Sequence, residues 1–152
     1  MGLEHSIAIE SASQSDVCAL LRAGHEQMDA MIPDRARQEF SVEAVSRDSV
    51  KLLVARIDGV AVGCCAIVLK EDHSELKKMY VSPNARRKGI ADQLLVRSEQ
   101  IVRENDIEII KLESAAVLTA AHNLYARHGF SIGSAFGDHI EDPRSIFLEK
   151  QL

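Results

Sequence analysis

Two spacings of apolar residues recur along the chain, and they predict an order of strands and helices. The segments 51–57 and 60–69 are rich in closely spaced apolar and β-branched residues, as is typical of strands. Asp58-Gly59 lies between them and favours a tight hairpin turn. Further on, apolar or small residues recur every three or four positions, which predicts a half-buried helix. This helical face consists of Ile90, Ala91, Leu94, Leu95, Ser98, Ile101 and Val102.

The N-terminal part of the chain predicts one strand and two helices. Residues 6–10 alternate as a first strand does, and a helical face follows with Val17, Leu20, Leu21, Gly24, Met28 and Met31. Ser13 and Asp16 have the spacing of a capping box at the start of this helix, and Pro33 is expected to end it. A short second helix is predicted over 41–46.

The C-terminal part predicts four more strands and a last helix. A strand starts at Glu75 and leads to the long helix, and further strands are expected at 108–113, 130–135 and 145–148, with a helix over 119–128. The helix between the strands at 75 and 108 implies a parallel or nearly parallel pair. The whole chain, 1–152, is predicted to be a single α/β (α+β) domain. We expect a mixed, mostly antiparallel twisted sheet of about seven strands flanked by about four helices.

Composition excludes several classes of function. The net charge is −5, so a broad nucleic-acid-binding surface is not expected. No apolar stretch has the length of a membrane span, and no membrane association is predicted. Cys64 and Cys65 lie in an apolar strand and form no disulfide or zinc pattern, which indicates reduced structural cysteines in a cytoplasmic protein. The histidines are scattered, so no metal is predicted.

A basic segment precedes the long helix. Residues 86–91, here called the phosphate loop, are Arg86, Arg87, Lys88, Gly89, Ile90 and Ala91. Backbone N–H groups at a helix N-terminus are unpaired and favour anions, and small residues let phosphate oxygens approach. The loop is therefore predicted to bind phosphate. It matches neither the P-loop nor the Gly-x-Gly-x-x-Gly dinucleotide pattern.

Two motifs resemble those of the GNAT superfamily of N-acetyltransferases. Arg86, Gly89 and Ala91 match the Arg/Gln-x-x-Gly-x-Gly/Ala signature, and the segment 124–130 is similar to a second signature, Tyr-x-x-x-Gly-Phe. The order of elements resembles a complete GNAT domain. The segments 112–114 and 136–145 resemble small bacterial members that act on small molecules.

The resemblance implies acetyl-CoA as the cosubstrate, with its pyrophosphate on the phosphate loop. The strand residues Met79, Tyr80 and Val81 would pair with the pantetheine arm, and a backbone N–H near Met79–Tyr80 could stabilise an oxyanion. Many relatives carry an asparagine seven residues before the tyrosine, where this chain has Leu118. Thr119 and Asn123 are the candidates to replace its contact.

Acyl transfer to an amine needs a general acid and a base. The resemblance makes Tyr125 the acid that protonates the leaving thiolate, the alternative being a buried tyrosine with a satisfied hydroxyl. Glu75 holds the position of a catalytic glutamate in histone-acetylating members and is the candidate base, the alternative being an exposed strand residue. Glu113 is the second candidate. Asp138, Glu141 and Asp142 could attract a cationic amine and His139 or Arg144 a substrate carboxylate, although a solvated acidic loop is the favoured interpretation.

The predicted function is acetyl transfer from acetyl-CoA to a primary amine of a small molecule, such as an amino acid or related metabolite, by direct attack in a ternary complex. Acetylation of a protein N-terminus or lysine is one alternative. A CoA-binding sensor without turnover is another, and Leu118 favours it slightly. An exposed edge strand would also allow a homodimer.

Overall fold

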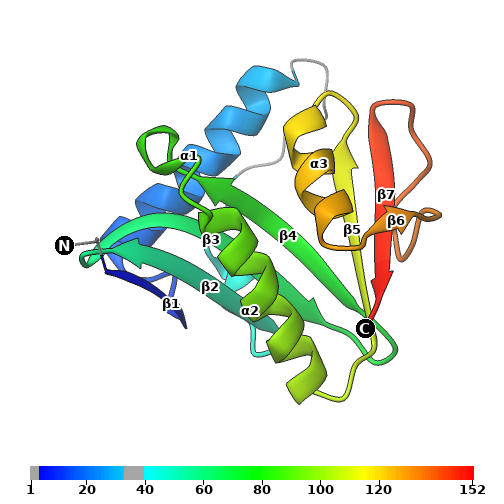
Figure 1. Cartoon of the computed structure of the whole chain (residues 1–152), viewed down its shortest axis with the longest axis horizontal. Coiled ribbons are helices and arrows are strands. Elements are labelled where there is room, and N and C mark those ends of the chain that lie inside the picture. Colours follow the sequence, from blue (N-terminus) through cyan, green and yellow to red (C-terminus); the bar gives the residue numbers. More distant parts are fainter. Residues whose placement is uncertain (1–3, 33–39) are drawn as a thin grey trace.

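A single seven-stranded sheet runs through a computed structural model of the chain, which describes residues 4–32 and 40–152 (Figure 1). The strand order is β1-β2-β3-β4-β5-β7-β6. The strands are β1 His5–Ile9, β2 Val50–Ile57, β3 Val60–Leu69, β4 Ser74–Val81, β5 Ile109–Ala115, β6 Ser131–Ile132 and β7 Ser145–Gln151. All neighbours are antiparallel except β4 and β5, so the predicted mixed sheet and its parallel crossover are confirmed.

Helices cover both faces of the sheet. They are α1 Ser15–Met31, α2 Ile90–Glu104 and α3 Thr119–Arg127, with 3₁₀ turns η1 Glu43–Val45 and η2 Pro83–Ala85. Successive side chains of β2 alternate between two cores, since Leu52 and Val54 pack with α1 whereas Leu53 and Ala55 pack with α2. Leu124 and Tyr125 of α3 share the core of α2, so α1 lies on one face and α2 and α3 lie on the other (Figure 1).

The hairpin between β2 and β3 forms where the sequence predicts it. Asp58 and Gly59 both have positive φ, 48° and 84°, as a two-residue turn between antiparallel strands requires. The long helix is confirmed as well, because Ile90, Leu94, Leu95, Ile101 and Val102 are all buried.

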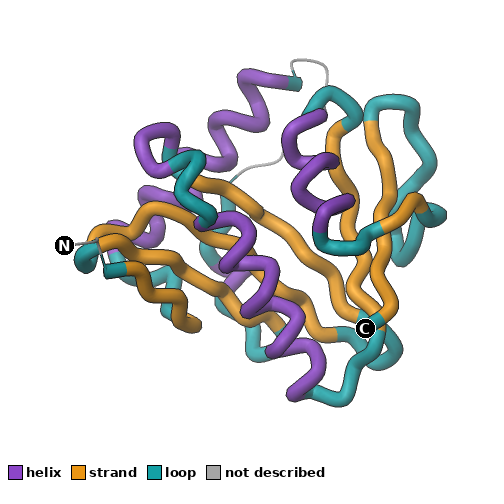
Figure 2. Tube along the Cα trace, in the orientation of Figure 1, coloured by secondary structure: helices purple, strands orange, loops and turns teal. Residues whose placement is uncertain are grey.

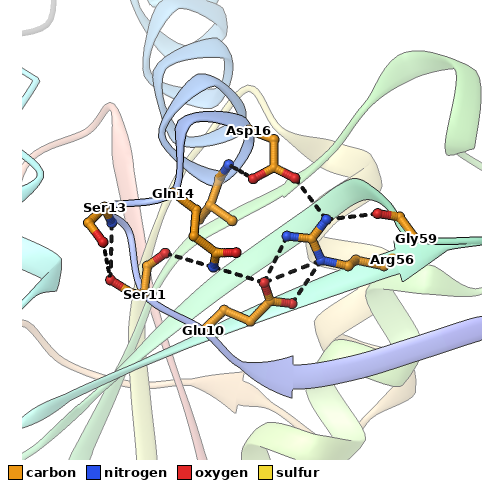
Figure 3. A network of polar contacts seen from close by, with 8 residues as sticks. Glu10, Ser11, Ser13, Gln14, Asp16, Arg56 and Gly59 are labelled. Carbon is orange, nitrogen blue, oxygen red and sulfur yellow. Dashed lines mark hydrogen bonds and ion pairs between the residues drawn. The ribbon is translucent and has the colours of Figure 1, made fainter.

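Other local predictions were wrong. Gln14, not Ser13, is the N-cap of α1, and its side chain makes no capping hydrogen bond. Asp16 does not complete a capping box: it accepts a hydrogen bond from the Val17 N–H and forms an ion pair with Arg56 (Figure 3). Met31 is 43% exposed, so the buried face of α1 ends before it. Pro33 lies outside the described residues.

Three predicted elements have different lengths. The helix expected over 41–46 is the single 3₁₀ turn η1. The strand expected over 130–135 shrinks to the two residues of β6, because Phe130 turns into the core beside Tyr125. Strand β7 extends to Gln151 rather than ending at Leu148.

Strands β4 and β5 separate soon after they begin. They pair only at Ser74↔Ile110 and Glu75↔Lys111, and beyond this point the two strands diverge (Figures 1 and 2). An irregularity in the β3–β4 register accompanies the divergence, and Lys78 adopts a left-handed φ of 61° there. A non-glycine residue pays roughly 1 kcal/mol or more for this conformation, so the surrounding sheet must hold it in place.

Candidate active site

A cavity of about 520 Å³ opens between the diverging strands. Its walls come from α1, β4, β5, α3 and the segment 136–144, here called the C-terminal loop. Lining residues with possible chemical or binding roles are Glu75, Met79, Tyr80, Glu113, Leu118, Tyr125, His139, Asp142 and Arg144. Residues predicted from separate parts of the sequence therefore meet at one place.

The phosphate loop follows η2 and leads into α2, and none of its residues lines the cavity. Gly89 is the N-cap of α2 with φ of 77°, and it offers no side-chain cap to the first helical N–H groups. A Cβ at Gly89 would meet only Gln93 Nε2, at 4.0 Å, so there is open space beside the backbone. Arg87 and Lys88, which directly precede Gly89 in the chain, are exposed. An uncapped helix N-terminus with two nearby cations fits a pyrophosphate.

Not every residue of the phosphate loop presents its side chain to an anion. Arg86 Nε donates to the Val81 carbonyl at 3.0 Å and its Nη2 donates to Gln27 Oε1 at 2.9 Å, so this side chain ties the loop to β4 and α1. Ile90 is buried in the core. Arg86 and Ile90 would therefore contribute to an anion site through their backbone groups and by holding the loop in position.

Among the predicted pantetheine residues, Met79 and Tyr80 line the cavity. Val81 follows them at the end of β4 and accepts the bond from Arg86. The Tyr80 ring packs against α1 at Gly24, where an added Cβ would lie 3.1 Å from Tyr80 Cβ. Strand β4 is thus held against α1 at the level of the cavity.

Cys64 and Cys65 are poor nucleophiles in this environment. Both are buried, and burial raises the pKa of each thiol to about 12. Cys64 donates to the Lys78 carbonyl, and Cys65 shares a hydrogen bond with the Ser98 hydroxyl. A thiolate would be scarce at neutral pH, which agrees with the structural role predicted for these cysteines.

Tyr125 points from α3 into the cavity wall. It is 6% exposed and lines the cavity, and its ring packs edge-to-face on that of Phe130, with 5.7 Å between the ring centroids. Burial raises the pKa of its phenol above the usual value, with a smaller contribution from Cys65. The phenol therefore keeps its proton at neutral pH, which a general acid must do before it acts.

The predicted substitutes for the missing asparagine do not reach the cavity. Thr119 and Asn123 are exposed on α3 and are not among the lining residues. Leu118 lines the cavity itself, as the N-cap of α3. Nearby, His122 Nε2 lies 3.0 Å from the Ala115 carbonyl and joins α3 to the end of β5.

The sequence did not predict the contact that His139 makes. Its Nε2 lies 2.9 Å from Glu75 Oε1, and its Nδ1 lies 3.6 Å from Glu113 Oε1. The imidazole thus bridges the two carboxylates that were the candidate bases. The sequence had suggested only a substrate carboxylate as its partner. Sixty-four positions separate Glu75 from His139, and no periodic pattern in the C-terminal loop signals the contact.

The C-terminal loop contributes a second charged contact. Arg144 pairs with Asp142 at 2.8 Å, and this hydrogen-bonded guanidinium lowers the pKa of the Asp142 carboxyl to about 2. Arg144 therefore lines the cavity with its guanidinium already paired to the Asp142 carboxylate. Within residues 4–32 and 40–152, no group of three potential ligands could hold a metal ion, and no helix is long and apolar enough to cross a membrane.

Comparisons with known proteins agree on one family. The model of the Acetyltransferase (GNAT) family matches residues 15–130. The chain is 31% identical over 149 residues to the "IAA acetyltransferase" of Azospirillum brasilense, covering 97% of each. It is 29% identical over 149 residues to the uncharacterized N-acetyltransferase YsnE of Bacillus subtilis, covering 96% of this chain and 99% of that one.

Solved structures show the same fold. A Klebsiella pneumoniae protein described as an acyl-CoA N-acyltransferase matches with a TM-score of 0.80 and 31% identity, covering 97% of each chain. The PaiA N-acetyltransferase of Thermoplasma acidophilum, solved in complex with coenzyme A, matches with a TM-score of 0.72 at 19% identity, covering 97% and 99%.

Proposed function

Because the chain belongs to the GNAT family of acetyltransferases, we propose that its cavity transfers the acetyl group of acetyl-CoA to the primary amine of a small molecule. The observation that carries the proposal is the meeting of Tyr125 and Glu75 in one cavity, on elements that flank the gap between β4 and β5. A volume of about 520 Å³ is within the range for small-molecule sites.

The residues around the gap fit acetyl-CoA, which supplies an acetyl group activated as a thioester. Arg87, Lys88 and the first N–H groups of α2 would hold its pyrophosphate. Backbone groups of Met79, Tyr80 and Val81, on the strand that leaves β5, would pair with the pantetheine arm. One N–H near Met79 and Tyr80 would also stabilise the oxyanion formed on the acetyl carbonyl.

Two side chains would carry out the proton transfers of the reaction. Glu75 takes the proton that the attacking nitrogen must lose, and Tyr125 gives its proton to the departing thiolate. The phenol can supply this proton because it is protonated at neutral pH even at the ordinary tyrosine pKa of about 10. The raised pKa values of Cys64 and Cys65 speak against a covalent acetyl-enzyme, so the amine attacks directly in a ternary complex.

The walls of the cavity favour a small acceptor over a protein chain. Helix α1 contributes Gly24, His25 and Met28 on one side, and the C-terminal loop contributes on the other. The relative that shares 31% identity over nearly the whole chain is named an IAA acetyltransferase. Two ribosomal-protein-alanine N-acetyltransferases of known structure, from Brucella melitensis and Escherichia coli, share only 22% and 15% identity with this chain and support the fold alone.

Thiol release from acetyl-CoA against a panel of amino acids, polyamines and aminoglycosides tests the function, with Tyr125→Phe as the variant. We expect turnover with at least one amine, and a kcat about 10²- to 10⁴-fold lower in Tyr125→Phe at unchanged acetyl-CoA affinity. A binding isotherm and a melting curve control for folding. Binding without turnover on any amine would favour the sensor, and turnover only on peptides would favour the protein acetyltransferase.

A further inference from the structure

His139 joins the two acidic side chains of the cavity into one unit. Its Nε2 is within hydrogen-bonding distance of Glu75, and its Nδ1 lies at ion-pair distance from Glu113. A neutral imidazole carries a hydrogen on one ring nitrogen and accepts at the other, so with the hydrogen on Nδ1 facing Glu113, Nε2 can accept a hydrogen bond from a protonated Glu75. The three groups come from β4, β5 and the C-terminal loop, so only the folded chain brings them together.

The imidazole is held in this position by packing. Its ring lies 4.8 Å from the ring of Phe136 and 5.9 Å from that of Phe147, and both phenylalanines are buried. A side chain so held is a fixed part of the cavity wall rather than a movable cover. Its role should therefore be one that a stationary group can perform.

The two carboxylates differ in their access to water. The Glu75 side chain is 10% exposed, whereas that of Glu113 is 36% exposed. A proton accepted by Glu75 thus has a narrower path to water than a proton held by Glu113. His139 spans the distance between them.

We propose that Glu75, His139 and Glu113 form a relay that carries the acceptor's proton from the cavity to solvent. This inference rests on the proposed function. An N–H bond of the acceptor breaks and an O–H bond forms on Glu75; His139 receives that proton at Nε2 and gives up the one on Nδ1 to Glu113, which releases it to water. After the product has left, the ring returns to its starting tautomer by exchanging its two ring hydrogens with water in the open cavity, where the His139 side chain is 25% exposed. The net result is one proton moved, with no other bond changed.

Other charged groups surround the relay without interrupting it. Lys77 Nζ lies 3.9 Å from Glu75 Oε1, and Lys111 Nζ of β5 lies over the Phe136 ring, 5.7 Å from its centroid. Asp142 and Arg144 neutralise each other within the C-terminal loop. His139 is accordingly a positioning and relay residue, distinct from the group that meets the acceptor.

His139→Gln tests the relay, because glutamine can still donate to Glu75 but cannot pass a proton on. We expect kcat to fall about 10- to 100-fold with acetyl-CoA affinity unchanged, and added imidazole to restore part of the lost rate in a concentration-dependent way. The matched control is His73→Gln. His73 also packs on Phe136, at 5.8 Å, and also pairs with a carboxylate, that of Asp72, yet it does not line the cavity. This control should keep its rate and gain nothing from imidazole.

Glu113→Gln is the second variant, since it stops the relay at its outer end and leaves the ring contacts of His139 in place. It should show the same loss and the same rescue. Full activity of either variant, or a loss of rate that imidazole does not restore, would overturn the relay. Turnover by the wild-type protein would in that case still support the proposed acetyl transfer. If the wild-type protein turns over no amine, the proposed function fails instead.

Discussion

At the scale of single residues, Arg56 connects the start of α1 to the sheet. It bonds Glu10 through Nε and Nη2 and Asp16 through Nη1, and it donates to the Gly59 carbonyl (Figure 3). These bonds fix the β1–α1 junction over the β2–β3 hairpin. Since α1 forms one wall of the cavity, this arginine also helps to position that wall.

Arg56→Met should lower the free energy of unfolding by about 1–2 kcal/mol at pH 7, as expected for charge-assisted hydrogen bonds that are half-buried. The bond from Arg56 lowers the pKa of Glu10 below its ordinary value of 4.5. A carboxyl with a lowered folded-state pKa stabilises above its unfolded-state value, and this stabilisation is lost as the pH falls through the folded-state value. The difference between wild type and variant should thus be constant above about pH 5.5 and shrink below pH 4.5.

Urea unfolding at several pH values measures this difference. Arg47→Met is the control, since Arg47 is exposed and no described residue forms an ion pair with it. Its effect should be within about 0.5 kcal/mol at every pH. A penalty for Arg56→Met that persists unchanged at pH 3 would show that packing, not charge, holds this junction.

At the scale of elements, the approach of α2 to β3 sets the position of the phosphate loop. A Cβ at Gly63 would lie 3.0 Å from Ile90 Cγ2 and 3.3 Å from the Tyr80 carbonyl. Ile90 is the first residue of α2, directly after Gly89, so added volume at Gly63 must displace the start of the helix, where the phosphate loop lies. Gly63→Ala should cost about 1–3 kcal/mol of stability and weaken acetyl-CoA binding roughly tenfold.

Gly24→Ala is the paired variant, because its Cβ would crowd Tyr80 from α1, at 3.1 Å, and leave the α2 terminus untouched. It should also destabilise the fold, but its acetyl-CoA affinity should change less than that of Gly63→Ala. Calorimetric titration with acetyl-CoA, beside melting curves, separates the two effects. Equal affinities in the two variants would contradict a specific link between Gly63 and the phosphate loop.

The elements also show which features a sequence can predict. The Asp58-Gly59 hairpin and helix α2 depend on contacts between near neighbours and on one periodic apolar face, so both were predicted. The cap of α1 was missed because Asp16 is drawn to Arg56, forty positions away. The contact between His139 and Glu75 was missed for the same reason: it depends on how the C-terminal loop folds over β4, which no local pattern records.

At the scale of the whole molecule, the sheet consists of two parts that meet at a short seam. β1 to β4 with α1 and α2 form one part, and β5 to β7 with α3 form the other, with two ladder positions between them (Figure 2). The pantetheine arm of acetyl-CoA, lying between β4 and β5, would bridge the gap where these two strands do not pair. Acetyl-CoA should therefore stabilise the protein along the gap as well as at the phosphate loop.

We expect saturating acetyl-CoA, at about 100 times its dissociation constant, to add about 2.7 kcal/mol and to raise the melting temperature by roughly 5–10 °C. Amide hydrogen exchange locates the effect. It should slow along residues 76–81 of β4 and 112–115 of β5, which face each other across the gap, more than along β1, which pairs with β2 at the far edge. The diphosphate of adenosine, which has the pyrophosphate but no pantetheine, is the control ligand and should protect the phosphate loop alone. If acetyl-CoA gave the same restricted pattern, the arm would not lie between the strands, and the proposed pantetheine contacts of Met79 to Val81 would be wrong.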